Sequence, residues 1–443
     1  MPTAYITHPD CRRHEMGEGH PECPERLDAI SDYLVSTRLM ALLAPYDAPL
    51  ATPEQLGRAH SSLYVNEIFA AAPSQGYLQL DPDTAMNPHS LAAALRAAGA
   101  AVLGAELVVR GEMKRAFCAV RPPGHHALRD QAMGFCLFNN VAVGIRHALD
   151  VLGVERVALV DFDAHHGNGS EDILAGDERV LMASTFQRDF YPFQGDVPRG
   201  PNMVNVGLPA GASGEHLRRA VTDAWLPALD AFRPQLVFIS AGFDGHHADD
   251  MSGLRWSEDD YAWVTREVAA LSERHCGGRI VSCLEGGYHL FHLARSAAAQ
   301  AGDAAAQYAL GLMYAHGDGL ARDDALAAKW FAAAAAQGAP PAGVDKPVSG
   351  QGRKDRKRSE AEKRQRLQPL RKQVQELEQR MTRLSTQRAR IDGELAQGGI
   401  YTEANKLKLK ELLLEQVKVR QELDSTEEAW LAASAALEEA EHD

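Results

Sequence analysis

Short apolar runs rich in β-branched residues alternate with alanine-rich helical stretches along the first two thirds of the chain. The runs "RVALVDFD" (156–163), "QLVFISAGFD" (235–244) and "RIVSCLEGG" (279–287) are continuously apolar and are bounded by glycine and charge. Such runs are typical of strands that are buried on both faces of a parallel sheet. Residues 89–109 and 214–232 carry helical periodicity. The pattern predicts an α/β domain up to about residue 296, with helices covering the sheet.

The composition changes after that point. Residues 297–338 form two alanine-rich helical stretches around "AHGDGLARDD", and they resemble one Sel-like repeat, a relative of the tetratricopeptide helical pair. One solenoid repeat cannot bury its own apolar face, so it must dock on the main domain, pair with another chain or be poorly ordered. Residues 339–352, "APPAGVDKPVSGQG", read as a linker rich in proline and glycine.

The last segment, 353–443, begins with the basic stretch "RKDRKRSEAEKRQR" and continues with apolar residues at alternating spacings of three and four. "QGGIYTEANK" interrupts this pattern, which predicts an antiparallel two-helix coiled coil. "EAEKRQRLQPLRKQVQELEQ" and "YTEANKLKLKELLLEQ" resemble the C-terminal coiled-coil domain of the ABC-F ATPases, although the chain contains no GxxxxGK[ST] motif. The basic half, 353–390, can contact nucleic-acid phosphates. A solvated coiled-coil face explains it better, because acids balance the second helix.

Composition narrows the class of protein. The chain has 443 residues and a formal net charge of -14, which argues against a protein devoted wholly to nucleic acid. Its six cysteines contain no CxxC pair, so reduced thiols in a cytoplasmic compartment are the simplest interpretation. The first residues do not resemble a secretory signal, and no apolar run approaches the ~20 residues of a membrane span.

Polar residues of unusual type follow four of the apolar runs. The runs lead into His125 and His126; Asp161, Asp163, His165 and His166; Asp244 and His246; and Glu285, Gly286, Gly287 and Tyr288. Each group alone has an ordinary structural explanation, such as a turn or a helix cap. In open α/β sheets, however, ligands bind at the carboxyl ends of the strands. Buried carboxylates and imidazoles usually pair or bind metal, so we expect these groups to meet in one crevice.

A metal site is the best explanation for the polar residues at the end of the second run, between Asp161 and His166. Asp163 and His165 are two residues apart, and in extended chain their side chains point to the same side. Asp244 supplies a third ligand from a second strand. Three oxygen and nitrogen ligands with an open fourth position are typical of catalytic zinc. Asp161 shares this face, or else accepts the N–H of a catalytic histidine.

The motifs "GHPECPERL", "RPPGHHA", "GFCLFNNVA", "DFDAHHGNG", "AGFDGH" and "LEGGY", in this order, resemble the histone deacetylase family. The class II and bacterial histone-deacetylase-like amidohydrolases are the most similar, because they carry "EGGY" and an asparagine after "HHG". The resemblance covers about 1–296. It implies an arginase-like α/β fold with a mainly parallel sheet and helices on both faces.

The resemblance also implies a role for each matching residue. One catalytic zinc ion would be bound by Asp163, His165 and Asp244. The paired catalytic imidazoles would be His125 and His126, supported by Asp161 and Asn168. Tyr288 would supply the hydroxyl that stabilises the transition state. The resemblance assigns the substrate channel to Gly134, Phe135 and Tyr191, a contact at its rim to Asp83, and the turn before the tyrosine to Gly286 and Gly287. A structural potassium ion is expected at the backbone carbonyls of Asp161, Asp163 and His165, with Ser184.

Hydrolysis of a linear amide follows from these residues. Zinc polarises the amide carbonyl and lowers the pKa of a bound water, His126 acts as general base, and the Tyr288 hydroxyl stabilises the oxyanion. The dinuclear manganese ureohydrolases share the fold by resemblance. Their second metal would require acids at positions occupied here by Gly167 and His246, so we predict a mononuclear site.

Several functions remain open at this stage. The first is deacetylation of acetyl-lysine in proteins or peptides, and its close relative is hydrolysis of acetylated polyamines or other small amides. An inactive deacetylase fold that serves as a binding or adapter protein is the alternative. We expect no membrane association, and an oligomer is possible. Three segments that resemble unrelated families stand end to end, which indicates a fusion or a chimera.

Overall fold

The computed structural model describes residues 3–301 and single helical positions between residues 369 and 429. The chain divides into two compact units, Met1–Ala342 and Gly343–Asp443. The predicted linker, and the predicted repeat beyond residue 301, lie outside the described residues.

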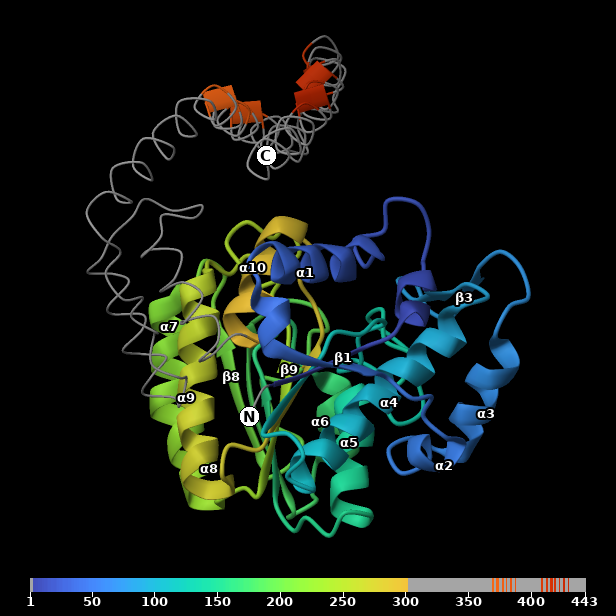
Figure 1. The fold of residues 1–443 in the computed structure, drawn as a ribbon, viewed down its shortest axis with the longest axis vertical. Helices are drawn as coiled ribbons and strands as arrows, with labels where there is room; N and C mark the ends of the chain where they lie inside the picture. The colour runs from blue at the N-terminus through green and yellow to red at the C-terminus, as the bar shows by residue number, and fades with distance from the viewer. Residues whose placement is uncertain are drawn as a thin grey trace, which may run out of the picture. The chain divides into compact units, whose positions relative to one another are not determined.

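Within residues 3–301, eight parallel strands form the central sheet, in the order β2-β1-β5-β10-β9-β6-β7-β8 (Figure 1). The strands are β1 (Thr3–Thr7), β2 (Leu43–Asp47), β5 (Arg115–Cys118), β6 (Val157–Asp161), β7 (Val180–Gln187), β8 (Met203–Leu208), β9 (Leu236–Ala241) and β10 (Ile280–Leu284). A separate antiparallel pair joins β3 (Leu78–Gln79) and β4 (Ala85–Met86). The predicted parallel α/β sheet is confirmed.

The order of the strands brings the polar residues that follow them close together. β5, β10, β9 and β6 are consecutive neighbours at the centre of the sheet, and they are the four strands that lead into the polar groups noted in the sequence. Every residue of β6, β9 and β10 is buried, which is why these strands read as continuous apolar runs. Because the strands are parallel, their carboxyl ends lie at one edge of the sheet, where the polar groups converge.

Helices cover both faces of the sheet. They are α1 (Glu25–Ser36), α2 (Pro53–Leu56), α3 (Ser62–Ala71), α4 (Ser90–Val109), α5 (Asn140–Asp150), α6 (Asn168–Leu174), α7 (Gly214–Ala220), α8 (Leu226–Phe232), α9 (Glu258–Cys276) and α10 (Leu290–Ala301), with short turns η1 (Pro9–Arg13), η2 (Leu39–Leu42) and η3 (Val221–Trp225). α4 and α5 pack on one face and α7 to α9 on the other (Figure 1).

One expectation about helices needs correction, and another is refined. α4 is 20 residues long and apolar enough to cross a membrane by composition alone, contrary to the prediction that no run approaches that length. It packs against β5, β10 and α5 as a core helix. Residues 214–232 are helical throughout, as expected, with a π-helical turn at η3 that ends two residues before Pro227. Proline has no N–H to donate, and a π-turn accommodates the interrupted ladder.

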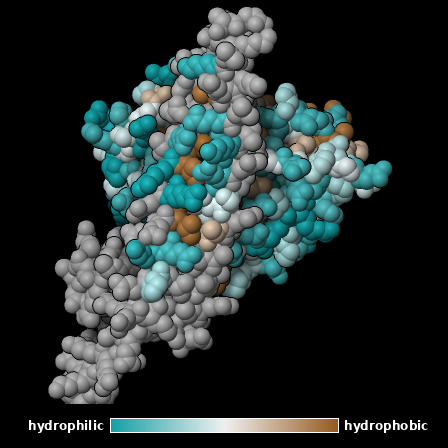
Figure 2. All heavy atoms as spheres, turned by 90° about the horizontal axis from the view of Figure 1, so that it is seen from above, coloured by the Kyte–Doolittle hydropathy of each residue, from teal (hydrophilic) through white to brown (hydrophobic). Residues whose placement is uncertain are grey.

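α10 closes the α/β domain. It packs on α1 and α9 and continues through residue 296 to Ala301. Ala297 and Ala298 are buried in the main hydrophobic core. Residues 297–300 therefore belong to the packing of this domain. On the face that Figure 2 shows, the described surface is mostly hydrophilic with separate small apolar patches.

The described positions of the second unit are helical. Gln387 Nε2 donates to Glu415 Oε1 at 2.8 Å, and Arg380 lies 3.8 Å from Glu422. Leu412 is buried. The coiled-coil hairpin stays a prediction.

Candidate metal centre and channel

The chain leaves the sheet at Asp161 and makes two turns that are fixed by its own aspartates. Asp161 Oδ1 accepts the N–H of Asp163 at 3.1 Å, and Asp163 Oδ1 accepts the N–H of His165 at 2.9 Å. Asp163 and His165 thus lie in a bend and not in the extended chain that the sequence suggested. Aspartate favours such local bonds to the backbone two residues on.

Three buried side chains converge beyond this bend. The ligand atoms of Asp163, His165 and Asp244 lie within 4.8 Å of one another. His165 Nδ1 is 2.9 Å from Asp244 Oδ2 and 3.1 Å from Asp163 Oδ1. The two carboxylates and one imidazole are the ligand types of a three-ligand zinc site with an open position. The residues present therefore fit the expected zinc ion.

Glycines make room for these carboxylates. A Cβ atom at Gly286 would lie 2.3 Å from Asp244 Oδ2, and one at Gly242 would lie 1.9 Å from Asp163 Oδ2. Gly286 N–H also donates to Asp163 Oδ2 at 2.9 Å. Gly286 thus leaves space for the Asp244 carboxylate and donates its N–H to the Asp163 carboxylate. These roles add to the turn that was predicted for it from the sequence.

Two histidines stand beside the metal centre, 4.1 Å apart between ring centroids. His125 Nδ1 lies 3.0 Å from Asp161 Oδ2, and His126 Nδ1 lies 2.8 Å from Asn168 Oδ1. Because an amide oxygen only accepts, His126 carries its proton on Nδ1 and presents the lone pair of Nε2.

The surroundings separate the pKa values of the two imidazoles. Burial disfavours the charged form of both rings. For His125 the carboxylates of Asp163 and Asp161 outweigh burial and raise its pKa to about 10. For His126 burial dominates, and the neighbouring His125 and His165 act in the same direction, so its pKa is well below the usual value. A neutral His126 next to a protonated His125 is a base beside an acid.

A cavity of about 350 Å³ opens onto these groups. Its lining contains every predicted channel residue except Gly287, and adds several that the sequence did not single out. The lining residues are Asp83, Pro123, His125, His126, Gly134, Phe135, His165, Phe190, Tyr191, Asp250, Met251, Gly286 and Tyr288.

Aromatic rings form the walls of this cavity. The ring of Tyr191 meets His126 edge to face at 5.3 Å, and the ring of Phe135 meets Tyr288 in the same manner at 5.9 Å. Phe190 stacks on His165 at 5.5 Å. The walls of the cavity are therefore largely aromatic, with the carboxylates of Asp83 and Asp250 and the imidazoles of His125, His126 and His165 as its charged or titratable groups.

Asp83 is tied to the channel wall. Its Oδ1 accepts the N–H of Gly134 at 3.1 Å and the hydroxyl of Thr84 at 2.9 Å. Gly134 has a φ of 56°, and a Cβ there would lie 2.5 Å from the His126 ring. Only glycine is compatible with both constraints.

The loop that carries Tyr288 is held from two sides. Asp249 Oδ2 accepts the backbone N–H of Tyr288 at 2.6 Å, and the Arg26 guanidinium donates to the carbonyls of Glu285 and Gly287 at 2.5 and 2.6 Å. Gly287 has a φ of 115°, which strains any other residue. The Arg26 guanidinium also lies 4.9 Å from the centre of the Tyr288 ring.

Arg26 belongs to a fully buried ion network that sequence reasoning did not identify. Glu22 binds Arg26 Nη1 at 3.0 Å and Arg121 Nη2 at 2.6 Å. Burial opposes the charge of Glu22, yet Arg121 and its neighbours lower its pKa to about 2. "GHPECPERL" contains Glu22 and Arg26, but its spacing alone does not show a contact with residues 260 positions away.

Glu285 holds the loop that carries His125 and His126. Its buried carboxylate accepts the N–H groups of Gly124 at 2.6 Å and His125 at 3.1 Å, and the hydroxyl of Ser240 at 3.1 Å. Burial raises its pKa to about 7. The sequence placed Glu285 at a strand end without assigning it a role.

Ser184 lies opposite Asp161 in the β6–β7 register. It is buried, and its Oγ has no hydrogen-bond partner among the residues that the structure describes. An unpaired buried hydroxyl is uncommon and points to a missing partner.

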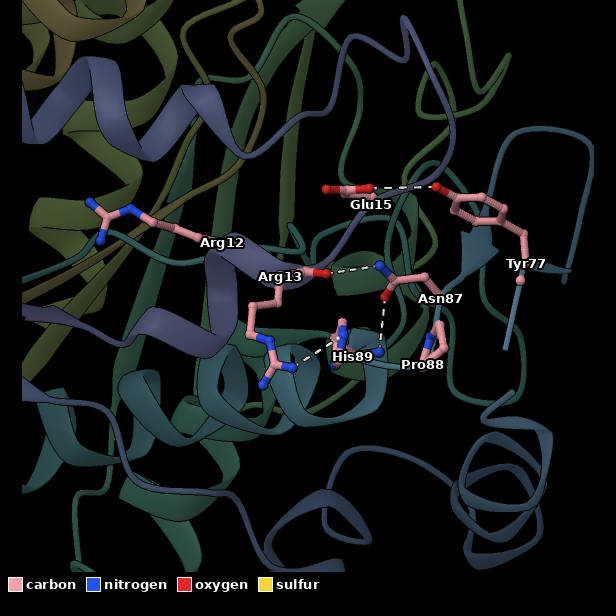
Figure 3. Close-up of a pocket in the computed structure, with 8 residues that line it drawn as sticks. Arg12, Arg13, Glu15, Tyr77, Asn87, Pro88 and His89 are labelled. Carbon is pink, nitrogen blue, oxygen red and sulfur yellow. Dashed lines mark hydrogen bonds between the residues drawn. The ribbon is translucent and has the colours of Figure 1, made fainter. Parts of the chain in front are cut away.

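A second, more open cavity of about 480 Å³ lies on the polar surface beside η1 (Figure 3). Arg13, Asn87 and His89 line it and bond to one another: Asn87 Nδ2 donates to the Arg13 carbonyl at 2.8 Å, and Arg13 Nη2 lies 3.2 Å from His89 Nε2. It is the larger of the two, but the predicted catalytic side chains face the other cavity.

Comparisons with known proteins agree with this geometry. A family model described as the histone deacetylase domain matches residues 20–303. The histone deacetylase-like amidohydrolase of Pseudomonas aeruginosa is 39% identical over 278 residues, which cover 61% of this chain and 73% of that protein. The type-2 histone deacetylase 2 of Dictyostelium discoideum is 33% identical over 332 residues, which cover 65% of this chain but only 20% of that protein.

Among solved structures, the crystal structure of the HDA15 HD domain superimposes with a TM-score of 0.64 at 33% identity. The match covers 68% of this chain and 88% of that one.

The parallel sheet and the buried Asp-His-Asp group at its carboxyl edge define a metal-dependent amidohydrolase of the α/β class. The chain belongs to the histone deacetylase family. It is a deacetylase or amidohydrolase of that family.

Proposed function

We propose that this protein hydrolyses the amide bond of N-acetylated amines with a single zinc ion, and that acetyl-lysine in proteins or peptides is its substrate. The observation that carries the proposal is the cavity lined by the aromatic rings of Phe135, Phe190 and Tyr191, which reaches His165 of the Asp163, His165 and Asp244 group. An acetylated primary amine on a linear methylene chain fits a cavity of this kind.

Zinc, when bound by Asp163, His165 and Asp244, supplies Lewis-acid polarisation of the carbonyl and a water of lowered pKa. The chain's own residues do the rest. His126 Nε2, which its Asn168 contact leaves unprotonated, takes a proton from the attacking water. His125, held charged by the carboxylates of Asp163 and Asp161, protonates the leaving amine.

Tyr288 completes the site as a donor to the developing oxyanion. Removal of one such donor typically costs roughly 10²–10³ in rate. Asp249 and Arg26 fix the backbone on each side of Tyr288, so the loop that carries the ring is held in place before the reaction. Phe135 and Tyr191 exclude water from the methylene chain, and Asp83 is available to bind a substrate N–H at the rim.

A structural potassium ion is part of the proposal. The unpaired hydroxyl of Ser184 supports it, because the carbonyls of Asp161, Asp163 and His165 belong to the adjoining strand end and bend. Potassium accepts such neutral oxygen ligands. Cytoplasmic location, contacts of the basic 353–390 segment with nucleic acid, and self-association are further proposals that rest on sequence alone.

The test is turnover of an acetyl-lysine peptide by the zinc-loaded full chain, compared with an acetylated polyamine. Asp163→Ala and Tyr288→Phe should each abolish most of the activity. Tyr261→Phe is the matched control, because Tyr261 is a buried tyrosine away from the cavity lining. Peptide turnover that survives Tyr288→Phe would contradict the mechanism. A strong preference for the polyamine would favour the small-amide alternative.

A further inference from the structure

A second group of metal-binding side chains lies outside the described cavity. The ligand atoms of His246, Glu258 and His292 lie within 4.8 Å of one another. The three residues come from separate parts of the fold: the loop after β9, the first residue of α9 and the first turn of α10. Zinc-type ions take this combination of imidazole and carboxylate ligands.

We propose that His246, Glu258 and His292 bind a second divalent transition-metal ion of the zinc class, at a site separate from the catalytic one. The proposal does not depend on which amide the protein hydrolyses. Its role is structural, because the ion would connect α9, α10 and the loop after β9.

The distances suit a shared ion once one of the two imidazoles turns, because the rings of His246 and His292 are stacked 4.1 Å apart at 21° and each lone pair lies in its ring plane. His292 Nδ1 is 3.0 Å from Glu258 Oε1, and His246 Nε2 is 3.4 Å from Glu258 Oε2. Ligand atoms around a tetrahedral ion with bonds of about 2.1 Å are about 3.4 Å apart. The side chains of Glu258 and His292 are each 23% exposed, so an ion can reach the site from solvent.

His246 gives an independent indication. It is 1% exposed, and its Nε2 has no hydrogen-bond partner in the part of the chain that the structure describes. This nitrogen faces the Glu258 carboxylate. A lone pair on this nitrogen would face the Glu258 carboxylate and the His292 ring, and a cation between them is the partner that satisfies all three groups.

Binding has two identifiable costs. The Ala248 N–H donates to His246 Nδ1 at 3.2 Å, which places the ring proton on Nε2. Metal binding moves this proton to Nδ1, so the Ala248 amide must release its contact. Arg295 Nε also donates to Glu258 Oε1 at 2.7 Å and competes with a cation. The Arg295 side chain is 44% exposed and is free to turn toward solvent.

The cluster lies next to the loop that carries Tyr288, so an ion bound there would affect that loop. Asp249, in the same loop as His246, holds the N–H groups of Tyr288 and His289. His289 lies 4.8 Å from His292 between ring centroids, and His247 lies 4.3 Å from His246, so each is a source of a fourth ligand. An ion here would therefore restrain the segment directly after Tyr288.

The experiment counts bound metal in the full chain after chelation and titration with Co²⁺ or Zn²⁺ against a competing chelator. We expect two ions in the wild type and one in Glu258→Gln and in His292→Gln. His275→Gln is the matched control: His275 also pairs with a carboxylate, that of Asp230, but lacks a third ligand. It should retain two ions.

Two further variants make the test decisive. Asp163→Asn should keep one ion, and its melting temperature should rise with zinc unless His292→Gln is added. Arg295→Gln should tighten the second ion several-fold, because it removes the competing cation. One ion in the wild type, or two ions in a folded His292→Gln protein, would overturn the inference. Neither outcome affects the turnover test, so the two proposals fail separately.

Discussion

Replacement of Glu22 by glutamine tests whether the buried ion network stabilises the fold and positions Tyr288. The carboxylate is fully buried and contacts the guanidinium groups of Arg121 and Arg26. Glutamine keeps the shape and one acceptor oxygen but removes the charge. The two buried guanidinium groups then lack the carboxylate that they shared. Loss of such a buried partner lowers the free energy of unfolding by several kcal/mol.

The magnitude follows from the pKa of Glu22, which is about 2 in the folded protein against an ordinary value of 4.5. Since a tenfold change in proton affinity is worth about 1.4 kcal/mol, the difference corresponds to about 3 kcal/mol of folding free energy. A depressed carboxyl pKa stabilises the fold above pH 4.5. That contribution is lost as the pH falls from 4.5 through about 2.

The assay is urea unfolding followed by fluorescence, since Trp225 and Trp256 are completely buried in the α/β domain. At pH 7 the Glu22→Gln protein should be less stable than the wild type by about 3 kcal/mol. The difference should shrink below pH 4.5, where the wild-type carboxyl begins to take up its proton. A loss under about 1 kcal/mol at pH 7 would refute the reasoning. Deacetylation should fall as well, because Arg26 loses the anion that orients it toward the Tyr288 loop.

Three other predictions follow. Gly286→Ala should weaken zinc binding and turnover at least tenfold, because its Cβ would lie 2.3 Å from Asp244 Oδ2; unchanged zinc affinity by competition titration would count against this. Asn168→Asp should raise the pKa of His126 by placing an anion on Nδ1, so the acid limb of the pH–rate profile should move to higher pH; an unmoved limb would mean that His126 is not the base. His14 is buried with a pKa lowered, chiefly by burial, to about 4 from 6.5, so the unfolded chain protonates first and stability falls from pH 6.5 to 4. His14→Gln should flatten urea midpoints measured across that window, and an equally steep decline would exclude His14 as a source.

Most of the candidate site was predictable because it follows local rules. Buried parallel strands are continuously apolar, so a polar residue directly after such a strand stands out. Asp163, His165 and Asp244 were identified in this way. Asp161 was proposed from its position as a ligand or as an acceptor for a catalytic histidine, and Asn168 followed from the family motifs; the structure places both against the predicted histidines.

Contacts between distant segments were not predictable from one sequence. The order β5-β10-β9-β6 is set by how the helices pack on the sheet, and no periodicity in the strands encodes it. Arg26 meets Gly287, and Glu22 meets Arg121, only after the chain has folded. Sequence patterns report what a residue does within its own helix or strand.

The sequence by itself therefore determined the class of fold, the family and the types of ligand, since each depends on residue chemistry over short spacings. The tertiary structure decided which groups surround Tyr288, why Gly286 has to lack a side chain, and that His246, Glu258 and His292 meet. These features depend on distances between segments, and those distances are fixed only by the packing of the helices on the sheet.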